Sequence, residues 1–381
     1  MTNNNLTILA IETSCDETAA AVVHAGTQVL SNVVASQLDE LRRYGGVVPE
    51  VASRQHILAM DAVIGEALAA VPDGWAGIDA IAATNGPGLS GALLTGLNTA
   101  KALAFARGLP LIGVNHIEAH IYANWLNQGS GAGSGEPMTP QFPLVALVVS
   151  GGHTLLVLLE GHGHYTLLGQ TRDDAAGEAF DKSARLIGLG FPGGPAIERA
   201  AEGVQSDLIL PRAWLRDSYD FSFSGIKTAV LHQVQAHNNN TEVGPVASKS
   251  MPSRGQGSGA RGQGAEATDQ GSSPTPQVPS PTFAAQLAYA FQESVVDVLV
   301  TKTVDAAKAY GATEILLAGG VAANRRLRAE LVRRSPIGVR FPLIALCTDN
   351  AAMVGAAAFY RYEAGIQSGW DLDVNPNLRL A

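Results

Sequence analysis

The sequence is short of the features that mark secreted and membrane proteins. It has two cysteines among 381 residues, Cys15 and Cys347, which is too few for a disulfide framework. Its first residues, MTNNNLTILAIETS, have no basic region ahead of an apolar stretch, so they do not resemble a secretory signal. The longest apolar run, residues 144–159, is interrupted by SGGH and is too short to span a bilayer. These absences predict a reduced, soluble protein of the cytoplasm with no membrane segment.

Positive charge is also scarce. Charged residues make up 15% of the chain and the formal net charge is −9. This balance argues against a protein that binds nucleic acid unaided, because phosphate neutralisation requires clustered lysines and arginines. One cluster near the C-terminus is interpreted either as a nucleic-acid contact or as the solvated face of a helix. It consists of Arg325, Arg326, Arg328, Arg333, Arg334 and Arg340.

Apolar residues are abundant, at 46% of the chain, and there are 42 glycines. A chain of this length exceeds the usual size of one hydrophobic core, so two domains are expected. Residues 237–281 stand apart because they nearly lack Leu, Ile and aromatic residues. Such a segment cannot bury enough apolar surface to offset the entropy of ordering, so it is predicted to be a disordered insertion.

The rest of the sequence contains a faint internal duplication. Residues 6–13 and 19–24 are typical of two buried strands around a polar turn, and residues 144–149 and 155–159 repeat that pattern. Later in each half, a short apolar strand runs into a glycine-containing turn and then a helix. These later units span residues 79–107 and 314–333, and further helix-period patterns cover residues 59–70 and 283–310.

Two similar halves predict an α/β protein with a cleft between two lobes. Glycine turns and helix N-termini present backbone N–H groups that favour anions, so the cleft is a candidate nucleotide site. The alternative is an ordinary two-domain α/β protein whose glycine turns are only turns.

Residues 115–120, NHIEAH, place two histidines four positions apart. On a helix this spacing puts His116 and His120 on one face, within reach of one metal ion. The motif is not the protease H-E-x-x-H, because Glu118 lies in the middle and the general base of that mechanism is missing. Asp349, in the segment CTDN, is a candidate third ligand. Surface histidines without a ligand are the alternative.

Spaced carboxylates occur in two glycine-containing segments, GEAFDK at residues 177–182 and FPGGPAIE at residues 191–198. Carboxylates of this kind accept hydrogen bonds from sugar hydroxyls. Surface charge and helix capping are the alternative. A third segment, FSFSGIKT at residues 221–228, alternates aromatic residues with serines, which suggests an edge strand before a helix.

Taken in order, these segments resemble the TsaD/Gcp family of tRNA N6-adenosine threonylcarbamoyltransferases, in its bacterial and organellar branch. The resemblance runs from residue 8 to about residue 365, and the insertion at residues 237–281 is its main departure. The matching blocks are IETSCDET at 11–18, GGVVPE at 45–50, NHIEAH at 115–120, VSGGHT at 149–154, AGEAFDK at 176–182, FSFSGIK at 221–227, AGGVAAN at 318–324 and CTDN at 347–350.

The resemblance implies a fold and a site. The fold is the two-lobed actin/Hsp70/sugar-kinase-like (ASKHA) superfold, with duplicated ribonuclease H-like halves and a central nucleotide cleft. Residues 1–115 and 350–381 would form the N-terminal lobe, and residues 116–349 the C-terminal lobe. The implied ligands of one divalent metal ion, iron by preference with zinc or magnesium as alternatives, are His116, His120 and Asp349. The implied substrate-binding residues are Val148, Val149, Ser150, Gly151, Gly152, Asp181, Gly194, Glu198 and Asn324.

The implied activity is transfer of a threonylcarbamoyl group from threonylcarbamoyl-AMP to N6 of adenosine 37, in tRNAs that read codons starting with A. The donor is a mixed anhydride and N6 is a weak nucleophile, so catalysis requires positioning and metal-assisted carbonyl polarisation. Glu12 or Asp16 is predicted to accept the N6 proton, with a structural carboxylate as the alternative. The implied partners are tRNA, a TsaB-like paralogue and a TsaE-like ATPase, and the arginine cluster is the expected tRNA contact.

Three other functions fit parts of the sequence. A metalloprotease would use the histidine pair but lacks the H-E-x-x-H arrangement. A sugar- or acetate-kinase-like phosphotransferase would share the fold without needing the histidines. A non-catalytic scaffold would need none of the polar segments, all of which are present.

Overall fold

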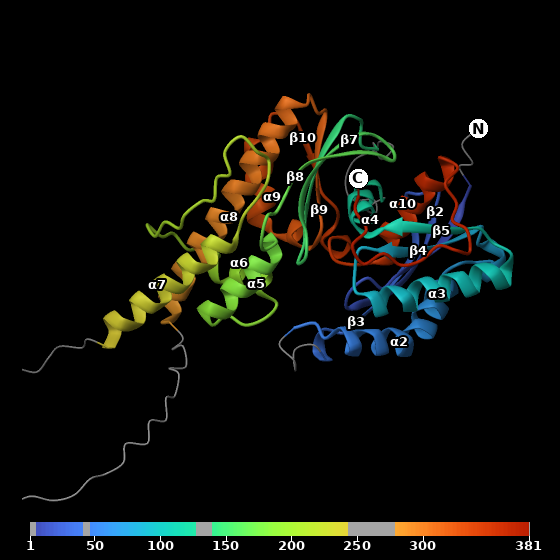
Figure 1. Ribbon diagram of the computed structural model, residues 1–381, viewed down its shortest axis with the longest axis horizontal. Coiled ribbons are helices and arrows are strands. Elements are labelled where there is room, and N and C mark those ends of the chain that lie inside the picture. The colour runs from blue at the N-terminus through green and yellow to red at the C-terminus, as the bar shows by residue number, and fades with distance from the viewer. Residues whose placement is uncertain (1–4, 41–45, 127–138, 243–278, 381) are drawn as a thin grey trace, which may run out of the picture.

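The computed structural model describes residues 5–40, 46–126, 139–242 and 279–380, which form two lobes along the long axis of the molecule (Figure 1). Each lobe is built on a five-stranded sheet. In the first sheet the order is β3-β2-β1-β4-β5, with β1 antiparallel to β2 and parallel to β4. Its strands are β1 (Thr7–Glu12), β2 (Glu17–His24), β3 (Gln28–Ser36), β4 (Ala80–Gly86) and β5 (Leu111–Asn115).

The second sheet repeats the first. Its order is β10-β9-β6-β7-β8, with β6 antiparallel to β7 and parallel to β9. Strand β6 therefore takes the place of β1, and β9 that of β4, so the predicted duplication is confirmed. The strands are β6 (Leu144–Val149), β7 (Thr154–Gly161), β8 (His164–Gln170), β9 (Glu314–Ala318) and β10 (Gly338–Arg340).

Helices cover both faces of the first sheet. All six residues of β1 are buried, and successive side chains point to opposite faces, as a strand requires. Leu9 and Ile11 pack in the core under α2 and α3, whereas Ile8 and Ala10 pack in the core under α4 and α10. The helices are α2 (Pro49–Ala69), α3 (Ser90–Arg107), α4 (His116–Tyr122) and α10 (Ala351–Glu363).

The second lobe is mainly helical on one side of its sheet (Figure 1). Phe180 of α5 and Phe291 of α8 meet edge to face at its centre, with ring centroids 5.1 Å apart. Its helices are α5 (Ala176–Ile187), α6 (Gly193–Ala201), α7 (Ser224–Glu242), α8 (Pro281–Ala309) and α9 (Arg325–Arg334). Short 3₁₀ helices are η1 (Gly74–Gly77), η2 (Ala123–Trp125), η3 (Gly320–Ala323) and η4 (Ile344–Leu346).

The helix α4 lies where the two lobes join. Its apolar residues belong to one core that also contains residues of β1 and α10 from the first lobe and of β6 and β9 from the second. The lobe boundaries stated above therefore stay a prediction. None of the helices within the described ranges is both long and apolar enough to cross a membrane.

The structure differs from three expectations. Helix α2 begins at Pro49, ten residues before the predicted pattern, because proline is well suited to a first helical position. Residues 221–223 form no edge strand; Phe221 makes a single bridge to Thr171 before α7 begins. Helix α7 also continues through residues 237–242, where His237 stacks on Phe283 with ring centroids 4.0 Å apart. At the other end of the predicted insertion α8 already begins at Pro281, and residues 243–278 lie outside the described residues.

Candidate functional site

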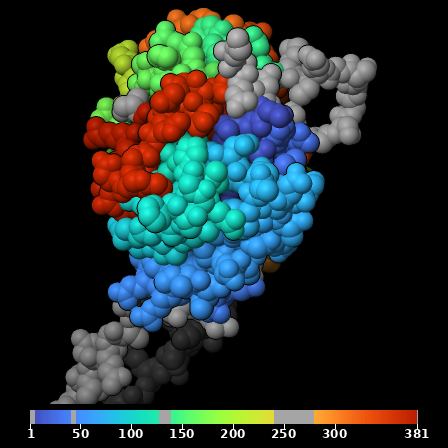
Figure 2. Space-filling view, turned by 90° about the vertical axis from the view of Figure 1, so that its right-hand side faces the viewer, coloured from blue at the N-terminus to red at the C-terminus, as the bar shows by residue number. Residues whose placement is uncertain are grey.

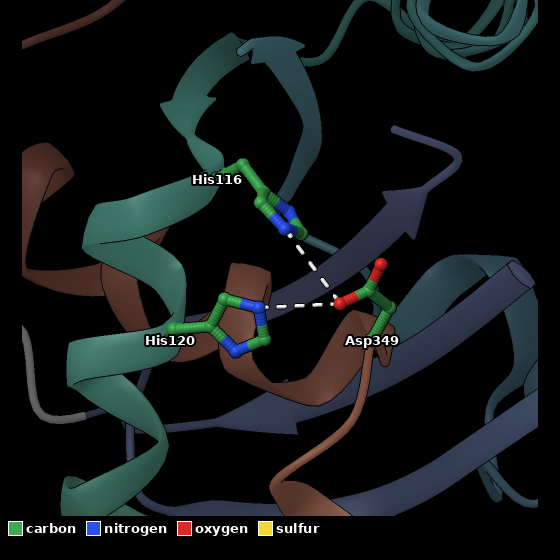
Figure 3. A group of neighbouring side chains, drawn as sticks. All are labelled: His116, His120 and Asp349. Atoms are coloured by element: carbon green, nitrogen blue, oxygen red, sulfur yellow. Dashed lines mark ion pairs between the residues drawn. The ribbon is translucent and has the colours of Figure 1, made fainter. Parts of the chain in front are cut away.

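Two histidines on α4 point toward one carboxylate (Figure 3). The helix starts at Asn115, whose side chain accepts hydrogen bonds from the backbone N–H groups of the next turn. One turn then separates His116 from His120, and their ring centroids lie 4.6 Å apart. Nε2 of His116 lies 3.6 Å from Oδ1 of Asp349, and Nε2 of His120 lies 3.2 Å from the same oxygen. The three predicted ligands are therefore brought together.

This group of side chains fits a divalent cation. One donor atom from each residue lies within 4.8 Å of the other two. His120 is buried, and among the described residues neither of its ring nitrogens has a hydrogen-bond partner of acceptable geometry. An unpaired buried nitrogen is costly, and a cation facing Asp349 would satisfy it. Burial on its own would raise the pKa of Asp349, but the neighbouring histidines hold it below its ordinary value.

Glu12 contacts His116 on the side of the ring away from Asp349. Its carboxylate accepts hydrogen bonds from the backbone N–H of Ser14 at 2.6 Å and from the hydroxyl of Thr84 at 2.6 Å. Its Oε2 also lies 3.1 Å from Nδ1 of His116. An ionised carboxylate only accepts, so Nδ1 carries a proton, and Nε2 is the nitrogen that would bind a metal after giving up its own proton. Burial would lower the pKa of His116, but the charges of Glu12 and Asp349 raise it to about 9.

The burial of Glu12 corrects one expectation. The side chain is 0% exposed and both oxygens are occupied by the protein, so Glu12 does not reach a substrate. Burial alone would raise its pKa, yet the charge of His116 keeps it below its ordinary value. Glu12 therefore positions His116, and is not the proton acceptor that we expected from the sequence.

Asp16 is the predicted acceptor that remains in the cleft. A cavity of about 670 Å³ is lined by Asp16 together with His116 and Asp349 and by the glycines of the β6–β7 turn. Burial raises the pKa of Asp16, and the charge of Asp349 adds to this effect. A carboxylate with a raised pKa is a better proton acceptor than an ordinary one.

Only some of the substrate-binding residues predicted at the end of β6 and in the β6–β7 turn line the cleft. Ser150, Gly151 and Gly152 line the cleft. Val148 and Val149 are completely buried, with their side chains in the cores on the two faces of β6, so those side chains do not reach the cleft. Strand alternation sends one side chain to each face of the sheet, so any substrate contact of Val148 and Val149 would have to use backbone atoms, and their predicted role in binding stays a prediction.

A second, smaller cavity of about 230 Å³ adjoins the first and shares Gly151 and Asp181 with it. The predicted residues Gly194, Glu198 and Asn324 also line it. Two carboxylates here also cap helices, as the alternative interpretation proposed. Asp181 accepts from the N–H of Gly193 at 2.7 Å, and Glu198 accepts from the N–H of Arg325 at 2.7 Å.

The arginine cluster does not form an open basic surface. Arg326 donates to Glu293 at 2.7 Å and pairs with Glu330 at 3.1 Å, and Arg334 pairs with Asp297 at 2.7 Å. The other members have partners too: Arg333 with Glu330, Arg340 with Glu314 at 3.1 Å, Arg328 with backbone carbonyls and Cys347, and Arg325 with Glu202 at 3.9 Å. Acidic side chains neutralise much of the cluster, which makes it a weaker candidate for a tRNA contact than its sequence suggested, and that contact stays a prediction.

Two further residues of the site escaped the sequence analysis. His153 closes the β6–β7 turn and lines the cleft, and burial together with the nearby His116 and His120 lowers its pKa to about 4. The sequence feature that could have pointed to His153 is its place inside the glycine-containing turn. Thr84, a partner of Glu12, gave no signal, because 72 residues separate the two in sequence.

Glu118 does not serve the histidine pair. One of its oxygens accepts from the hydroxyl of Tyr165 at 2.7 Å, and the other pairs with Arg361 at 3.0 Å. His116, His120 and Asp349 together form the metal-binding group. Because both oxygens of Glu118 are engaged away from this group, Glu118 cannot act as a protease general base. This geometry removes the structural support for a metalloprotease.

Comparisons with known proteins all point to one family. The family model of TsaD, described as tRNA N6-adenosine threonylcarbamoyltransferase, matches residues 28–356. A relative of that name from Thermomicrobium roseum is 54% identical over 374 residues, covering 98% of this chain and 96% of the relative. Another from Geobacillus kaustophilus is 50% identical over 384 residues, covering 99% and 98%.

The fold expectation is also confirmed. The two sheets share one strand order, as duplicated ribonuclease H-like halves require. The crystal structure of full-length HypF in its phosphate- and nucleotide-bound form is similar to 96% of this chain and 47% of that chain, with a TM-score of 0.54 and 12% identity. At this identity the similarity shows the fold alone.

Proposed function

The chain belongs to the TsaD family of tRNA N6-adenosine threonylcarbamoyltransferases, and from this premise we propose that its cleft takes the threonylcarbamoyl group from threonylcarbamoyl-AMP. The acceptor is N6 of adenosine 37 in tRNAs that read codons starting with A. The observation that carries the proposal is that the candidate metal site and the candidate nucleotide site adjoin each other. The metal-binding group and the glycine turn line one cavity, and the carboxylates of the second cavity adjoin it.

Binding of the donor uses both cavities. Backbone N–H groups of Gly151 and Gly152 bind the phosphate, since a glycine turn lets the backbone approach an anion closely. The N–H of Ser150 instead donates to the carbonyl of His153 at 2.8 Å, which closes the turn. Asp181 and Glu198 accept hydrogen bonds from the ribose hydroxyls in the second cavity. This arrangement leaves the threonylcarbamoyl end of the donor at the metal-binding group.

His116, His120 and Asp349 hold one divalent ion, with iron the preferred ion because two histidines and one carboxylate form a common iron(II) site. The bound ion supplies Lewis-acid polarisation of the carbamoyl carbonyl. Glu12 keeps His116 in the tautomer that exposes Nε2. His120 and Asp349 complete the ligand set and face each other at 3.2 Å (Figure 3).

The transfer itself exchanges one bond for another. N6 of the adenosine attacks the carbamoyl carbon, the bond from that carbon to the phosphate oxygen breaks, and AMP leaves with the electron pair. The proton released from N6 passes to the carboxylate of Asp16, which lines the cleft and has a raised pKa. Positioning accounts for most of the acceleration, because adenosine N6 is a weak nucleophile held against an activated carbonyl.

The proposed function also requires partner proteins that bind the tRNA. The tRNA must be held largely by other subunits, because the chain carries a net charge of −9 and its main arginine cluster is neutralised internally. We assign these roles to a TsaB-like paralogue and a TsaE-like ATPase in the cytoplasm.

A surface on the first lobe fits the TsaB-like paralogue. Ile57 and Leu58 of α2 are 65% and 74% exposed, and Phe105 of α3 is 75% exposed. Phe105 meets Trp370 of the C-terminal segment edge to face, so the exposed apolar surface at Phe105 continues onto that segment. Figure 2 shows this side, where the cyan α3 lies between the blue α2 and the red C-terminal segment. Exposed apolar side chains on two packed helices are typical of a helix-pair interface.

Replacing Leu58 with aspartate is expected to weaken binding of the TsaB-like paralogue by about thirtyfold, since a central apolar contact contributes about 2 kcal/mol. Isothermal titration of the paralogue into the purified chain measures this change. Ile209→Asp is the matched control, because Ile209 is 79% exposed but lies on the second lobe. Unchanged binding by Leu58→Asp, or equal weakening by the control, would contradict the assignment of this surface.

Reconstitution tests the proposed function. The chain is incubated with its two partner proteins, a threonylcarbamoyl-adenylate synthase, ATP, threonine, bicarbonate and unmodified tRNA, and the tRNA nucleosides are analysed by mass spectrometry. Threonylcarbamoyl-adenosine is expected only when the chain is present. Transfer of the γ-phosphate of ATP to a small acceptor, without modified tRNA, would instead indicate a phosphotransferase. Full tRNA modification without this chain would indicate a scaffold.

A further inference from the structure

The turn between β1 and β2 carries Asp16 into the cleft and is fixed by three carbonyl contacts. The carbonyl of Ser14 accepts from the N–H of Leu89 at 2.8 Å, and that of Asp16 accepts from the N–H of Gln37 at 3.2 Å. The carbonyl of Cys15, between them, lies 3.0 Å from Nε2 of His56. Two contacts thus come from the backbone and one comes from a side chain, so the last can be tested by substitution.

His56 is a buried residue of α2 with both ring nitrogens engaged. It is 0% exposed. A carbonyl can only accept, so Nε2 carries the proton and donates a hydrogen bond to the carbonyl oxygen of Cys15. Nδ1 then accepts from the hydroxyl of Thr18 at 2.8 Å and faces the amide nitrogen of Gln37 at 3.4 Å. These contacts fix the orientation and the tautomer of the imidazole.

The imidazole is also held neutral. Burial lowers the pKa of His56, although its contact with the Cys15 carbonyl and the charges of Glu12 and Asp16 oppose this effect. A neutral ring matches the contacts, because its Nδ1 can accept from the Thr18 hydroxyl, whereas a protonated ring would require that hydroxyl to accept instead.

Helix α2 and the β1–β2 turn approach the cleft from different sides. Gly46 and Val47, just before α2, line the same cavity as Cys15 and Asp16. Among the side-chain contacts of the described residues, His56 alone reaches from α2 to the carbonyl beside Asp16. Loss of this contact would let the turn move while the two backbone contacts remain.

We propose that His56 is a positioning residue for the transfer reaction: its Nε2–H holds the carbonyl of Cys15, and so keeps the carboxylate of Asp16 facing the cleft. The inference rests on the role of Asp16 proposed above. His56 touches neither the donor nor the tRNA and does not belong to the metal-binding group. Its effect is on the geometry of proton removal, where a displacement of about 1 Å can cost as much as about a hundredfold in rate.

Two substitutions separate the contacts of the ring. A glutamine at position 56 reaches as far as Nε2 and can donate to the Cys15 carbonyl, whereas an asparagine reaches only as far as Nδ1. His56→Asn is therefore expected to lower the rate constant of transfer about tenfold to a hundredfold, with an unchanged half-saturating donor concentration. His56→Gln is expected to keep the rate within about threefold of the unsubstituted chain, as rescue by the longer amide.

Single-turnover transfer from isolated threonylcarbamoyl-AMP to tRNA, with the partner proteins present, measures these rates. Melting temperatures and metal content are recorded for each variant. Equal losses of rate in both variants, accompanied by equally lowered melting temperatures, would show a merely structural residue and overturn the proposal. A raised half-saturating donor concentration with an unchanged rate constant would overturn it too.

A double-variant cycle tests the route through Asp16. If His56 acts by placing that carboxylate, His56→Asn in an Asp16→Asn background causes little further loss, whereas independent effects multiply and would overturn the proposal. A fully active Asp16→Asn enzyme would contradict the proposed role of Asp16 itself. A slow Asp16→Asn enzyme together with a fully active His56→Asn enzyme would contradict the role of His56 alone.

Discussion

Replacing His116 and His120 together with alanine is expected to lower tRNA threonylcarbamoylation by about a thousandfold or more. The two imidazoles supply two of the three donor atoms that face one another within 4.8 Å. Metal polarisation of a carbonyl is worth several kcal/mol, and each 1.4 kcal/mol corresponds to a factor of about ten in rate. The measurement is the amount of threonylcarbamoyl-adenosine formed per unit time, together with the metal content of the purified variant.

His164→Ala is the matched control for that experiment. His164 is exposed, and its Nδ1 lies 3.0 Å from the carbonyl of His162 in the same hairpin. It is expected to keep its activity and its metal. A double variant that transfers at the normal rate would remove the metal-binding group from the mechanism. A phosphotransferase of this fold would also be indifferent to the loss of the two histidines.

Replacing Glu12 with glutamine is expected to weaken metal binding about tenfold to a hundredfold, the usual effect of losing the partner of a metal-bound histidine. The glutamine has one acceptor oxygen, but the carboxylate of Glu12 serves three groups, on Ser14, Thr84 and His116. One of them would then face an N–H₂ group, and the tautomer of His116 would lose its fixed partner. Titration of the metal-free variant with iron(II) or zinc measures the affinity.

Thr84→Val is the control for Glu12→Gln, because it removes one donor and leaves the contact between Glu12 and His116 in place. A smaller loss of affinity is expected from it. Transfer by Glu12→Gln is expected to recover partly at high metal concentration, since its main defect is in binding. Unchanged affinity, or a loss no larger than that of Thr84→Val, would contradict the positioning role of Glu12.

The sequence predicted the parts of the site that depend on local spacing. His116 and His120 could be placed on one helix face because four positions make one turn. The paired hairpins could be placed in equivalent sheets because their apolar strands and polar turns recur with the same order. Proline after Val48 also marked the true start of α2, a signal that the apolar pattern alone did not reveal.

Long-range pairing set the limit of that prediction. The role of Glu12 depends on Thr84 and His116, which other elements bring to it from 72 and 104 residues away. The charge of the arginine cluster depends on Glu293 and Asp297 of α8, which no local pattern connects to α9. A sequence window shows which groups are present, but the pairing of distant groups decides their charge and accessibility.

Single turnover from isolated threonylcarbamoyl-AMP tests the central claim most directly. The chain and its partners are mixed with the adenylate and unmodified tRNA. ATP is added only in the amount that the partner proteins need in order to bind the chain. The account predicts that threonylcarbamoyl-adenosine and AMP appear in equal amounts and at the same rate. No modified tRNA from the isolated adenylate, in a preparation that modifies tRNA from threonine, bicarbonate and ATP, would contradict it.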